Sequence, residues 1–321
     1  MPTYNVICIG SATVDHFLTV EQPLSSLRLG DKILVKSVQV YSGGGATNAG
    51  AALATLGLKV KILSKLGNDH DAGFIRKELQ YYNVQNICCQ HSRHSTDFST
   101  IISSTKEKDR IIFVHKGASR DLHLTDFRHS QLRASWFYVG GLMGESFKTG
   151  KWLVRYAQEK RINVLFNPSL YVAKKGKKAL GGILRRTTIL VLNEEEAQAL
   201  LGTKSTEINF LLTSLQRLGP ETVVITNGSK KLFALHHQTI YSLPPPEVKV
   251  VHTAGAGDAF TAGLLAGLIK NYSFEDALRL GQVNASSVIQ HIGCKNILLT
   301  EKEARKRMGK YRIKVEKKKL H

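Results

Sequence analysis

The sequence lacks the features that mark a membrane-spanning or secreted protein. None of its apolar runs approaches the roughly 20 residues that a helix needs to cross a bilayer. The first residues, MPTYNVICIG, run directly into an apolar segment, without the basic region and cleavage site of a signal peptide. We therefore expect a cytoplasmic protein with no membrane partner.

Cysteine is scarce, and its spacing excludes several kinds of site. The four cysteines, Cys8, Cys88, Cys89 and Cys294, do not have the spacing of metal ligands. Cys88 and Cys89 are neighbours in a predicted strand, so their side chains should point to opposite faces, and free thiols in a reducing compartment are expected. The chain also lacks the pattern G-x-x-x-x-G-K-[ST], which excludes a Walker-type phosphate loop.

Acidic residues are few compared with basic ones. The 45 Lys and Arg against 25 Asp and Glu give a formal net charge of +20. Residues 302–321 hold ten Lys or Arg and two Glu, a net charge of +8. A basic tail can bind nucleic acid or an anionic surface, but we favour a solvated, partly frayed terminus and do not expect a nucleic-acid partner. The remaining positive charge should attract nucleotides and phosphates.

Length and hydrophobic pattern predict the fold class. At 321 residues, 42% of them hydrophobic, the chain should form one large domain with a lid, or two domains. Strands and helices alternate over most of the chain, which indicates a parallel sheet covered by helices on both faces. Residues 13–40 and 98–115 instead show the alternation of antiparallel strands, the second with a turn at 106–109. The other predicted elements are strands 5–9, 60–64, 84–88, 136–139, 164–166, 189–192 and 222–226, helices 47–56, 71–82, 147–159, 177–184, 194–201 and 208–218, and a hairpin at 232–243.

Residues 248–267, VKVVHTAGAGDAFTAGLLAG, have the pattern of a strand at 248–251, a tight glycine turn and a buried helix. The first N–H groups of a helix lack intrahelical partners and the helix dipole is positive there, so this turn predicts an anion site. Asp258 would repel a phosphate at this place unless it accepts a proton, which suits a general base. The alternative is a first-turn aspartate that only offsets the helix dipole.

A second glycine-rich turn, Gly43-Gly44-Gly45-Ala46-Thr47-Asn48, precedes an Ala-rich helix. Three consecutive glycines are more than a tight turn requires. We therefore favour close approach of a ligand over a purely structural turn.

These motifs resemble a known family. GAGDAFTAG resembles the C-terminal signature of the ribokinase, or PfkB, family of carbohydrate and nucleoside kinases, and Gly43 to Asn48 with the following Gly57 resembles its N-terminal signature. Between them, Asn193-Glu194-Glu195-Glu196 resembles the Asn-x-x-Glu element of the family. The resemblance extends from about Tyr4 to about Gly293. It implies a ribokinase-like three-layer α/β/α domain with a mostly parallel sheet and a small β-sheet lid.

The resemblance also implies a domain arrangement. Residues 1–12, 43–92 and 119–300 would form the α/β domain that binds nucleotide and substrate. Residues 13–42 and 93–118 would form the lid, and residues 301–321 a basic C-terminal helix or tail. The lid is expected to mediate a homodimer.

The same resemblance assigns roles to the motif residues. Asp258 would be the general base, with the amides of Gly255, Ala256 and Gly257 as the anion hole. Carboxylate and amide side chains suit hydrogen bonds to sugar hydroxyls. The implied substrate-binding residues are Asp15, Gly43, Gly44, Asn48 and Glu145.

Asn193 and Glu196 would position Mg²⁺, through waters, as suits an ion that keeps several of its waters. Their spacing is also nearly that of a capping box, so helix capping is the alternative. Thr226 and Gly228 resemble the segment that meets the nucleotide. Asn284 resembles an adenine-side residue, with a core or helix-surface asparagine as the alternative.

One position departs from the family pattern. Where the family has an aspartate in Asp-Thr-x-Gly-Ala-Gly-Asp, this chain has His252. In the family that acid belongs to a loop that often binds an activating monovalent cation, and imidazole is a poor ligand for potassium. We therefore do not expect potassium activation.

The implied activity is ATP-dependent phosphorylation of a hydroxymethyl group of a sugar, with Mg-ATP as donor. A nucleoside kinase of the same family, adenosine kinase-like, is the first alternative. A weakly active sugar- or nucleotide-binding protein is the alternative from another class, and the intact Gly255 to Asp258 motif argues against it.

Overall fold

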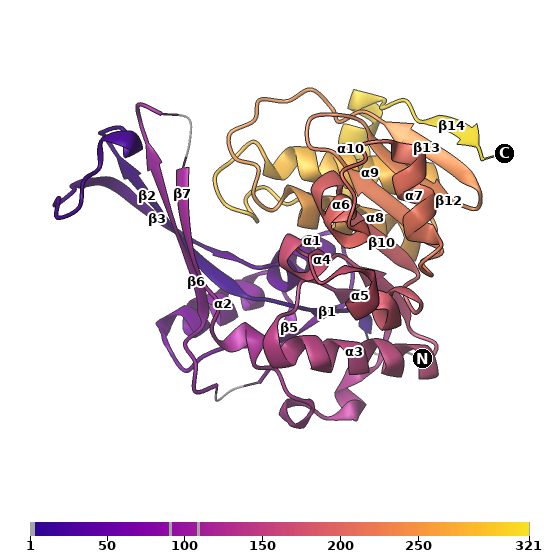
Figure 1. Ribbon diagram of the computed structural model, residues 1–321, viewed down its shortest axis with the longest axis horizontal. Helices are drawn as coiled ribbons and strands as arrows, with labels where there is room; N and C mark the ends of the chain where they lie inside the picture. The colour runs from indigo at the N-terminus through magenta and orange to yellow at the C-terminus, as the bar shows by residue number, and fades with distance from the viewer. Residues whose placement is uncertain (1–3, 90–91, 108–109, 321) are drawn as a thin grey trace.

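The computed structural model describes residues 4–89, 92–107 and 110–320. A large α/β body carries a smaller sheet that projects from one side (Figure 1). The side chains of residues 86–89 and the end of the predicted turn at 106–109 lie outside the described part. The predictions for the Cys88 and Cys89 side chains therefore stay untested. No helix of the described residues is long and apolar enough to cross a bilayer.

Within these residues the body is built on a ten-stranded sheet in the order β14-β13-β12-β11-β10-β9-β8-β1-β4-β5. Neighbours from β5 to β11 are parallel, whereas β12, β13 and β14 are added antiparallel at one edge. Parallel strands buried on both faces need continuous apolar runs, which these segments supply. The strands are β1 Tyr4–Ile9, β4 Val60–Lys65, β5 Gln85–Cys89, β8 Ala134–Val139, β9 Asn163–Phe166, β10 Ile189–Asn193, β11 Thr222–Thr226, β12 Leu232–His236, β13 Thr239–Leu243 and β14 Glu316–Lys319.

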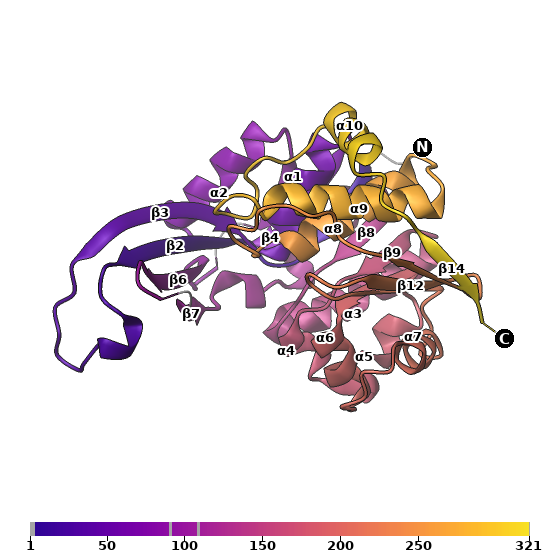
Figure 2. The same cartoon turned by 90° about the horizontal axis from the view of Figure 1, so that it is seen from above.

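Helices cover both faces of this sheet (Figure 2). One layer contains α1 Gly45–Thr55, α2 His70–Tyr81, α8 Ala256–Ile269, α9 Phe274–Val288 and α10 Glu301–Tyr311. The other contains α3 Gly144–Glu159, α4 Leu170–Ala173, α5 Gly176–Leu184, α6 Glu194–Leu201 and α7 Ile208–Gln216. Short 3₁₀ turns lie at Leu24–Ser26, Ala118–Arg120, Leu124–Asp126 and His129–Leu132.

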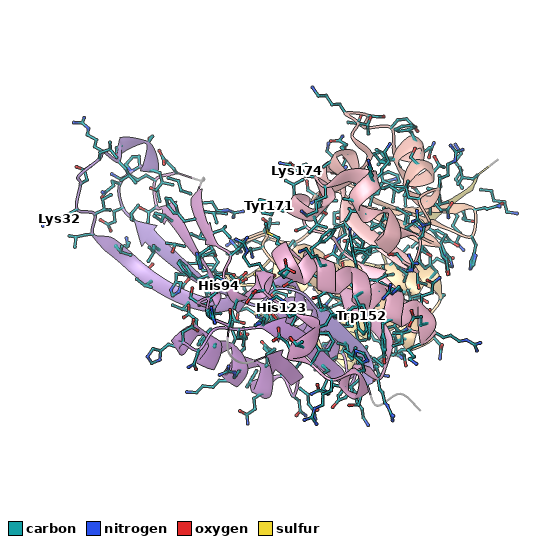
Figure 3. The ribbon with its side chains drawn as sticks, turned by 60° about the horizontal axis from the view of Figure 1, so that its bottom comes forward. Lys32, His94, His123, Trp152, Tyr171 and Lys174 are labelled. Carbon is teal, nitrogen blue, oxygen red and sulfur yellow. The ribbon has the colours of Figure 1, made fainter. Side chains whose placement is uncertain are left out.

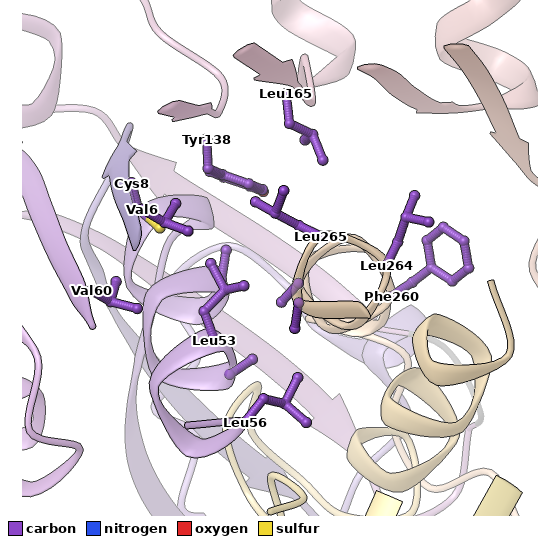
Figure 4. Close-up of a cluster of buried hydrophobic side chains, with 14 of the residues drawn as sticks. Val6, Cys8, Leu53, Leu56, Val60, Tyr138, Leu165, Phe260, Leu264 and Leu265 are labelled. Carbon is purple, nitrogen blue, oxygen red and sulfur yellow. The ribbon is translucent and has the colours of Figure 1, made fainter. Parts of the chain in front are cut away.

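Each layer has its own hydrophobic core. Side chains alternate along a strand, so Val6 and Cys8 of β1 face the α1 and α8 side, while Ile7 and Ile9 face the other. Figure 4 shows Leu53 of α1 and Leu265 of α8 in the cluster that also contains Val6 and Cys8 of β1 and Tyr138 of β8. This packing fixes the N-termini of α1 and α8 at the same end of the sheet, where the two glycine-rich turns lie.

The lid is a separate sheet with strand order β3-β2-β6-β7. Its strands are β2 Thr13–Val20, β3 Val35–Gly43, β6 Asp97–Ser104 and β7 Arg110–His115. The pair β2 and β6 is parallel and the two outer pairs are antiparallel. The predicted fold class, a mostly parallel α/β/α body with a small β lid, is confirmed.

The predicted strand at 248–251 is wrong. This segment crosses from β13 to α8 without pairing in either sheet, and Val250 and Val251 are 55% and 49% exposed. Its valines favour extended backbone, but strand formation also needs a partner edge. The edge beyond β13 is taken by β14, and the Val251 amide donates instead to the carbonyl of Ile289 (2.8 Å).

The C-terminal segment is also more ordered than expected. α10 starts with a capping box of Thr300 and Glu303, Ile313 is 6% exposed, and β14 extends the main sheet. The lysine-rich composition predicts a frayed tail because the few apolar residues among the lysines, such as Ile313, give a weak signal. Exposed lysines are typical of edge strands, where they discourage pairing with another chain.

Candidate active site

The glycine turn before α8 places Asp258 at a helix N-terminus. Gly255 is the N-cap and has a φ of 79°, a left-handed conformation that favours glycine. A side chain here would also collide with Cys294, since a Cβ would lie 2.7 Å from the Cys294 Cβ. Asp258 follows as the third residue of α8, beside amides that lack intrahelical partners.

Two polar side chains from other elements hold the Asp258 carboxylate. Asn48 of α1 donates from Nδ2 to Oδ2 (2.8 Å), and the Tyr138 hydroxyl of β8 donates to Oδ1 (3.1 Å). The same hydroxyl lies 3.0 Å from Oδ1 of Asn167. The carboxylate therefore has a fixed orientation, as a base in proton transfer requires.

Burial raises the pKa of Asp258, and the hydrogen bonds from Asn48 and Tyr138 and the charge of Lys295 oppose this effect. Burial and the nearby Asp258 raise the pKa of the Tyr138 hydroxyl, so that group stays protonated as a donor. Asp258 is thus a stronger base than an ordinary surface aspartate.

A cavity of about 260 Å³ under the lid contains polar groups suited to hydroxyls. Asp15 of β2 accepts a hydrogen bond from Ser99 Oγ of β6 (2.5 Å), and burial raises its pKa. Gly44 has a φ of 96° and a Cβ there would lie 2.5 Å from the Ser11 carbonyl oxygen. Gly43 lies directly against Asp15, so the glycine turn brings the main chain close to this cavity.

A second cavity, of about 430 Å³, lies beside the first. Asp258, Gly255 and Gly257 line it, and Ala256 lies between the two glycines. Ser11, Val114 and Lys116 line both cavities, so the two meet at these residues. Figure 3 shows Tyr171, which also lines the larger cavity, on the side of the body that faces the lid. Ligands bound in the two cavities would therefore come together at these three residues, and Asp258 lines the larger cavity.

Asn48 has one further property that points to a ligand. Its Oδ1 atom is buried and has no hydrogen-bond partner, while its Nδ2 is used by Asp258. Buried polar atoms are normally satisfied, so an unpaired acceptor at this place suits a hydroxyl donor from a bound molecule.

The far side of the larger cavity is formed by the ends of β10 and β11. Asn193, Glu196 and Thr226 all line it. Asn193 and Glu196 form a capping box, with Asn193 Oδ1 accepting from the Glu196 amide (2.8 Å) and Glu196 Oε2 accepting from the Asn193 amide (2.9 Å). Asn193 and Glu196 therefore cap the helix, as the alternative proposed, and they line the cavity as well.

The donor set suits a magnesium ion held largely by waters and phosphates. Among the residues that the structure describes, no group of three His, Cys, Asp or Glu is placed to hold a metal. Burial raises the pKa of Glu196 to about 7, and Asp258 adds to this effect. A nearby divalent cation would relieve the cost of its negative charge, and Mg²⁺ commonly keeps several waters.

Six predicted residues do not line either cavity. Gly43 and Ala256 are chain neighbours of lining glycines, and Asn48 hydrogen-bonds to the lining Asp258. The other three have no such link. Glu145 is 45% exposed at the start of α3 and pairs with Lys148 (2.7 Å). Asn284 is fully buried between α9 and α8, where its Nδ2 donates to the Ala259 carbonyl (2.8 Å). Gly228 lies in an exposed turn after β11 with a φ of 53°. Asn284 thus takes the core position that the sequence left as its alternative.

His252 lines the smaller cavity and packs against the lid. Its ring lies edge-on to Phe17 of β2, 5.2 Å between centroids, and its Nδ1 is buried without a partner. Burial, with the charge of Arg110 adding to it, lowers the pKa of His252. These contacts favour a neutral imidazole that serves in packing over a protonated ring that supplies a positive charge.

Sequence reasoning missed Tyr138, Asn167 and Lys116. Lys116 follows β7 and is held by the fully buried Asp97, whose Oδ2 lies 3.3 Å from its ammonium. Asp97 also accepts the amides of Gly117 and Ser119 (3.0 Å each). Lys116 could have been predicted as a site residue from its position, because it directly follows a predicted lid strand.

Comparison with known proteins identifies the family of the chain. Residues 3–301 match the profile described as pfkB family carbohydrate kinase, and the chain belongs to this family. A nucleoside kinase of Methanocaldococcus jannaschii is 24% identical over 316 residues, covering 96% of this chain and 98% of that protein. A ribokinase of Haemophilus influenzae is 23% identical over 299 residues, covering 92% and 95%. Because the kinases of this family transfer phosphoryl groups to sugar hydroxyls, the chain is a phosphotransferase with an alcohol group as acceptor.

Solved structures share the fold. The crystal structure of the M. jannaschii nucleoside kinase matches with a TM-score of 0.80 at 22% identity, covering 96% of this chain and 99% of that one. A ribokinase of Arabidopsis thaliana, complexed with ribose and ATP, matches with a TM-score of 0.81 at 21% identity, covering 94% and 98%. The chain is therefore a carbohydrate or nucleoside kinase of the ribokinase fold.

Proposed function

We propose that the chain phosphorylates a hydroxymethyl group of a sugar with ATP, using Asp258 as the general base. The observation that carries this proposal is the position of Asp258. It lies at the N-terminus of α8 and lines, with Gly255 and Gly257, the larger cavity, which meets the cavity with Asp15 at Ser11, Val114 and Lys116. A base beside an anion site and a hydroxyl-binding site is the arrangement that phosphoryl transfer to an alcohol needs.

In this proposal the acceptor lies in the smaller cavity, with its hydroxyls on Asp15, the Gly43–Gly44 main chain and Asn48 Oδ1. Its hydroxymethyl oxygen loses a proton to Asp258 and forms a bond to the γ-phosphorus of ATP. The bond from that phosphorus to the bridging oxygen breaks, and ADP leaves with its electron pair. The orientation of Asp258 by Asn48 and Tyr138 supports this step.

The larger cavity supplies charge stabilisation. Amides at Gly255, Ala256 and Gly257 would donate to the transferring phosphoryl group. Lys116, at the junction of the two cavities, adds a positive charge that Asp97 holds in place. Mg²⁺, positioned through waters by Asn193 and Glu196, would neutralise charge on the phosphates. Thr226 lies on the same wall, on the nucleotide side.

A nucleoside acceptor is favoured by one specific feature. The lining of the smaller cavity combines polar and charged groups with a strip of apolar side chains on the lid, Ile101, Ile112 and Val114. The strand registers place Ile101 opposite Ile112, and Ser99 opposite Val114. A free sugar has hydroxyls on all sides and gains little from such a strip, whereas a nucleobase attached to ribose would bury its faces there.

The deciding experiment measures ADP release with Mg-ATP across a panel of free sugars, sugar phosphates and nucleosides. Turnover with a sugar supports the first proposal, and a higher kcat/KM with a nucleoside supports the second. ADP release that no acceptor raises above the background hydrolysis of ATP would contradict both.

We also propose that the lid forms a homodimer. The lid face opposite Asp15 carries two cross-strand rows, Val38-Leu18-Ile102-Ile111 and Val40-His16-Thr100-Phe113. Val38 and Phe113 are 59% and 58% exposed, and exposed apolar patches of this kind mark interaction sites. Light scattering after size exclusion should give twice the chain mass for the wild type and a monomer for Phe113→Lys; a monomeric wild type would contradict the proposal.

A further inference from the structure

Lys295 is a buried lysine that the proposed chemistry does not use. It lies in the loop between α9 and α10, and its side chain is 3% exposed. Its ammonium donates to the main-chain oxygen of Ser42 (2.8 Å) and to the Ser42 hydroxyl, and it pairs with Oε2 of Glu78 (2.9 Å). A buried charge costs several kcal/mol unless it is paired and hydrogen-bonded, so the Lys295 ammonium needs Ser42 and Glu78 to remain buried.

The partners of Lys295 belong to the acceptor side of the site. Ser42 is the residue before Gly43 and Gly44, which approach the smaller cavity. Glu78 lies on α2 and also accepts a hydrogen bond from the Ser42 hydroxyl. The ammonium therefore fixes the end of β3 at the place where the glycine turn begins.

The neighbours of Lys295 belong to the phosphate side. Cys294 packs against Gly255, the N-cap of α8, with less space than a Cβ would need. Gly293 packs against the Tyr41 ring of β3 in the same way. The Lys295 carbonyl accepts a hydrogen bond from the Tyr82 hydroxyl (3.1 Å). One short loop thus touches both glycine turns, because Lys295 holds Ser42 beside the first and Cys294 packs against the second.

We propose that Lys295 is a positioning residue for phosphoryl transfer, because it holds the Gly43–Gly44 turn and the Gly255 turn in one fixed relation. This proposal rests on the proposed kinase function. Each turn belongs to a different part of the site, and Asp258 acts only if acceptor and phosphoryl group meet beside it. Misplacement by about 1 Å can cost roughly 100-fold in rate, so a tie between the turns has a large effect on turnover.

Electrostatics support the same role. The charge of Lys295 lowers the pKa of both Asp15 and Asp258, against the larger effect of their burial. If packing alone were needed here, an apolar side chain would serve as well, since buried ion pairs can be replaced by apolar residues without loss of stability. The ion pair can therefore be removed as a unit to separate stability from function.

The test compares Lys295→Met with the combined variant Lys295→Met and Glu78→Gln. Lys295→Met leaves Glu78 buried without its cation, so we expect a lower Tm; the combined variant should recover most of that loss. We expect kcat to fall by about 10- to 100-fold in both, with the acceptor KM raised and nucleotide Kd unchanged. Recovery of kcat together with Tm in the combined variant would overturn the proposal.

Lys65 provides a matched control. Its side chain is 6% exposed and pairs with Asp126 (2.8 Å) and, at longer range, with the partly exposed Asp121 (3.6 Å), and none of the three lines the two cavities. Lys65→Met with Asp126→Asn should change Tm but not kcat. An equal loss of kcat in this control would show that disturbing any buried ion pair has the same effect, and would overturn the specific role of Lys295.

Hydrogen exchange keeps this test independent of the kinase assignment. In the combined variant, amides of residues 42–46 and 253–258 should exchange faster than in the wild type, with the core strands unchanged. Unchanged exchange in both turns would contradict the tie even if turnover fell. If the wild type phosphorylates no acceptor, the proposed function fails, and the exchange experiment still decides the role of Lys295.

Discussion

Asn48 and Asp258 are 210 positions apart in the sequence, and the Asn48 amide donates to the Asp258 carboxylate at 2.8 Å. Each lies in the first turns of a helix that follows a glycine-rich turn, α1 after Gly44 and α8 after Gly255. The hydrogen bond joins the acceptor side of the site to the phosphate side. The relation between the two turns, more than either turn alone, defines the site.

The pH dependence of kcat/KM should report the raised pKa of Asp258. A general base must be deprotonated, so activity falls as pH drops through its pKa. Burial raises that pKa, so the acidic limb should lie above the usual aspartate value of about 3.9. A rate profile across pH 4 to 8 measures it, and a flat profile down to about pH 4 would contradict the assignment.

Magnesium dependence should change with pH because the pKa of Glu196 is raised to about 7. Metal binding favours the deprotonated carboxylate, so the Mg²⁺ concentration for half-maximal rate should fall as pH rises through that value. Glu196→Gln should raise the concentration needed and flatten this pH dependence.

Glu195→Gln is the control, since Glu195 is an exposed neighbour in the same helical turn and does not line the cavity. It should leave the Mg²⁺ curve unchanged. An unchanged curve for Glu196→Gln, combined with a lower Tm, would mean that Glu196 serves only the capping box.

Potassium should not activate the wild type. His252 packs on Phe17, and burial lowers its pKa, so the ring is neutral at pH 7 and supplies no charge to the loop. Rates in potassium, sodium and a bulky organic cation at constant ionic strength should be equal. Activation that emerges only in His252→Asp would support this view, and strong activation of the wild type would refute it.

The C-terminal segment should contribute to stability and not to turnover. Ile313 is 6% exposed beside α9 and α10, and a buried Ile→Ala change costs about 2–5 kcal/mol. Ile313→Ala should therefore lower the midpoint of chemical denaturation, with kcat retained because the segment does not line either cavity. Val250→Ala, at an exposed valine, is the control and should leave the midpoint unchanged. A large loss of kcat in Ile313→Ala would contradict the separation.

Most of the correct predictions came from local sequence patterns. Apolar periodicity and glycine turns depend on a few neighbouring residues, so the alternating strands and helices, the lid strands and the turn before Asp258 could be predicted. The strand at 248–251 was wrong because β-branched composition says nothing about which sheet edge is free. The order of the C-terminal segment was missed because one anchor, Ile313, lies among many lysines.

Contacts between distant segments could not be predicted. Tyr138 looks like any aromatic residue of a buried strand until the fold brings its hydroxyl to Asp258. No sequence pattern marks Lys295 as a buried, paired lysine, since its partners Ser42 and Glu78 are more than 200 positions away. Glu145 and Asn284 are the opposite case. Both resemble family site positions in the sequence, but neither lines a cavity in the structure.

The most direct measurement is the turnover of Asp258→Asn with an acceptor from the panel, together with its Tm and nucleotide Kd. Removing a general base should lower kcat by about two to four orders of magnitude. A carboxyl whose folded-state pKa is raised loses stability as pH rises through that pKa, so the asparagine variant should be at least as stable at pH 7, with nucleotide Kd unchanged. Turnover within about threefold of the wild type would contradict Asp258 as the base, since general-base loss costs far more.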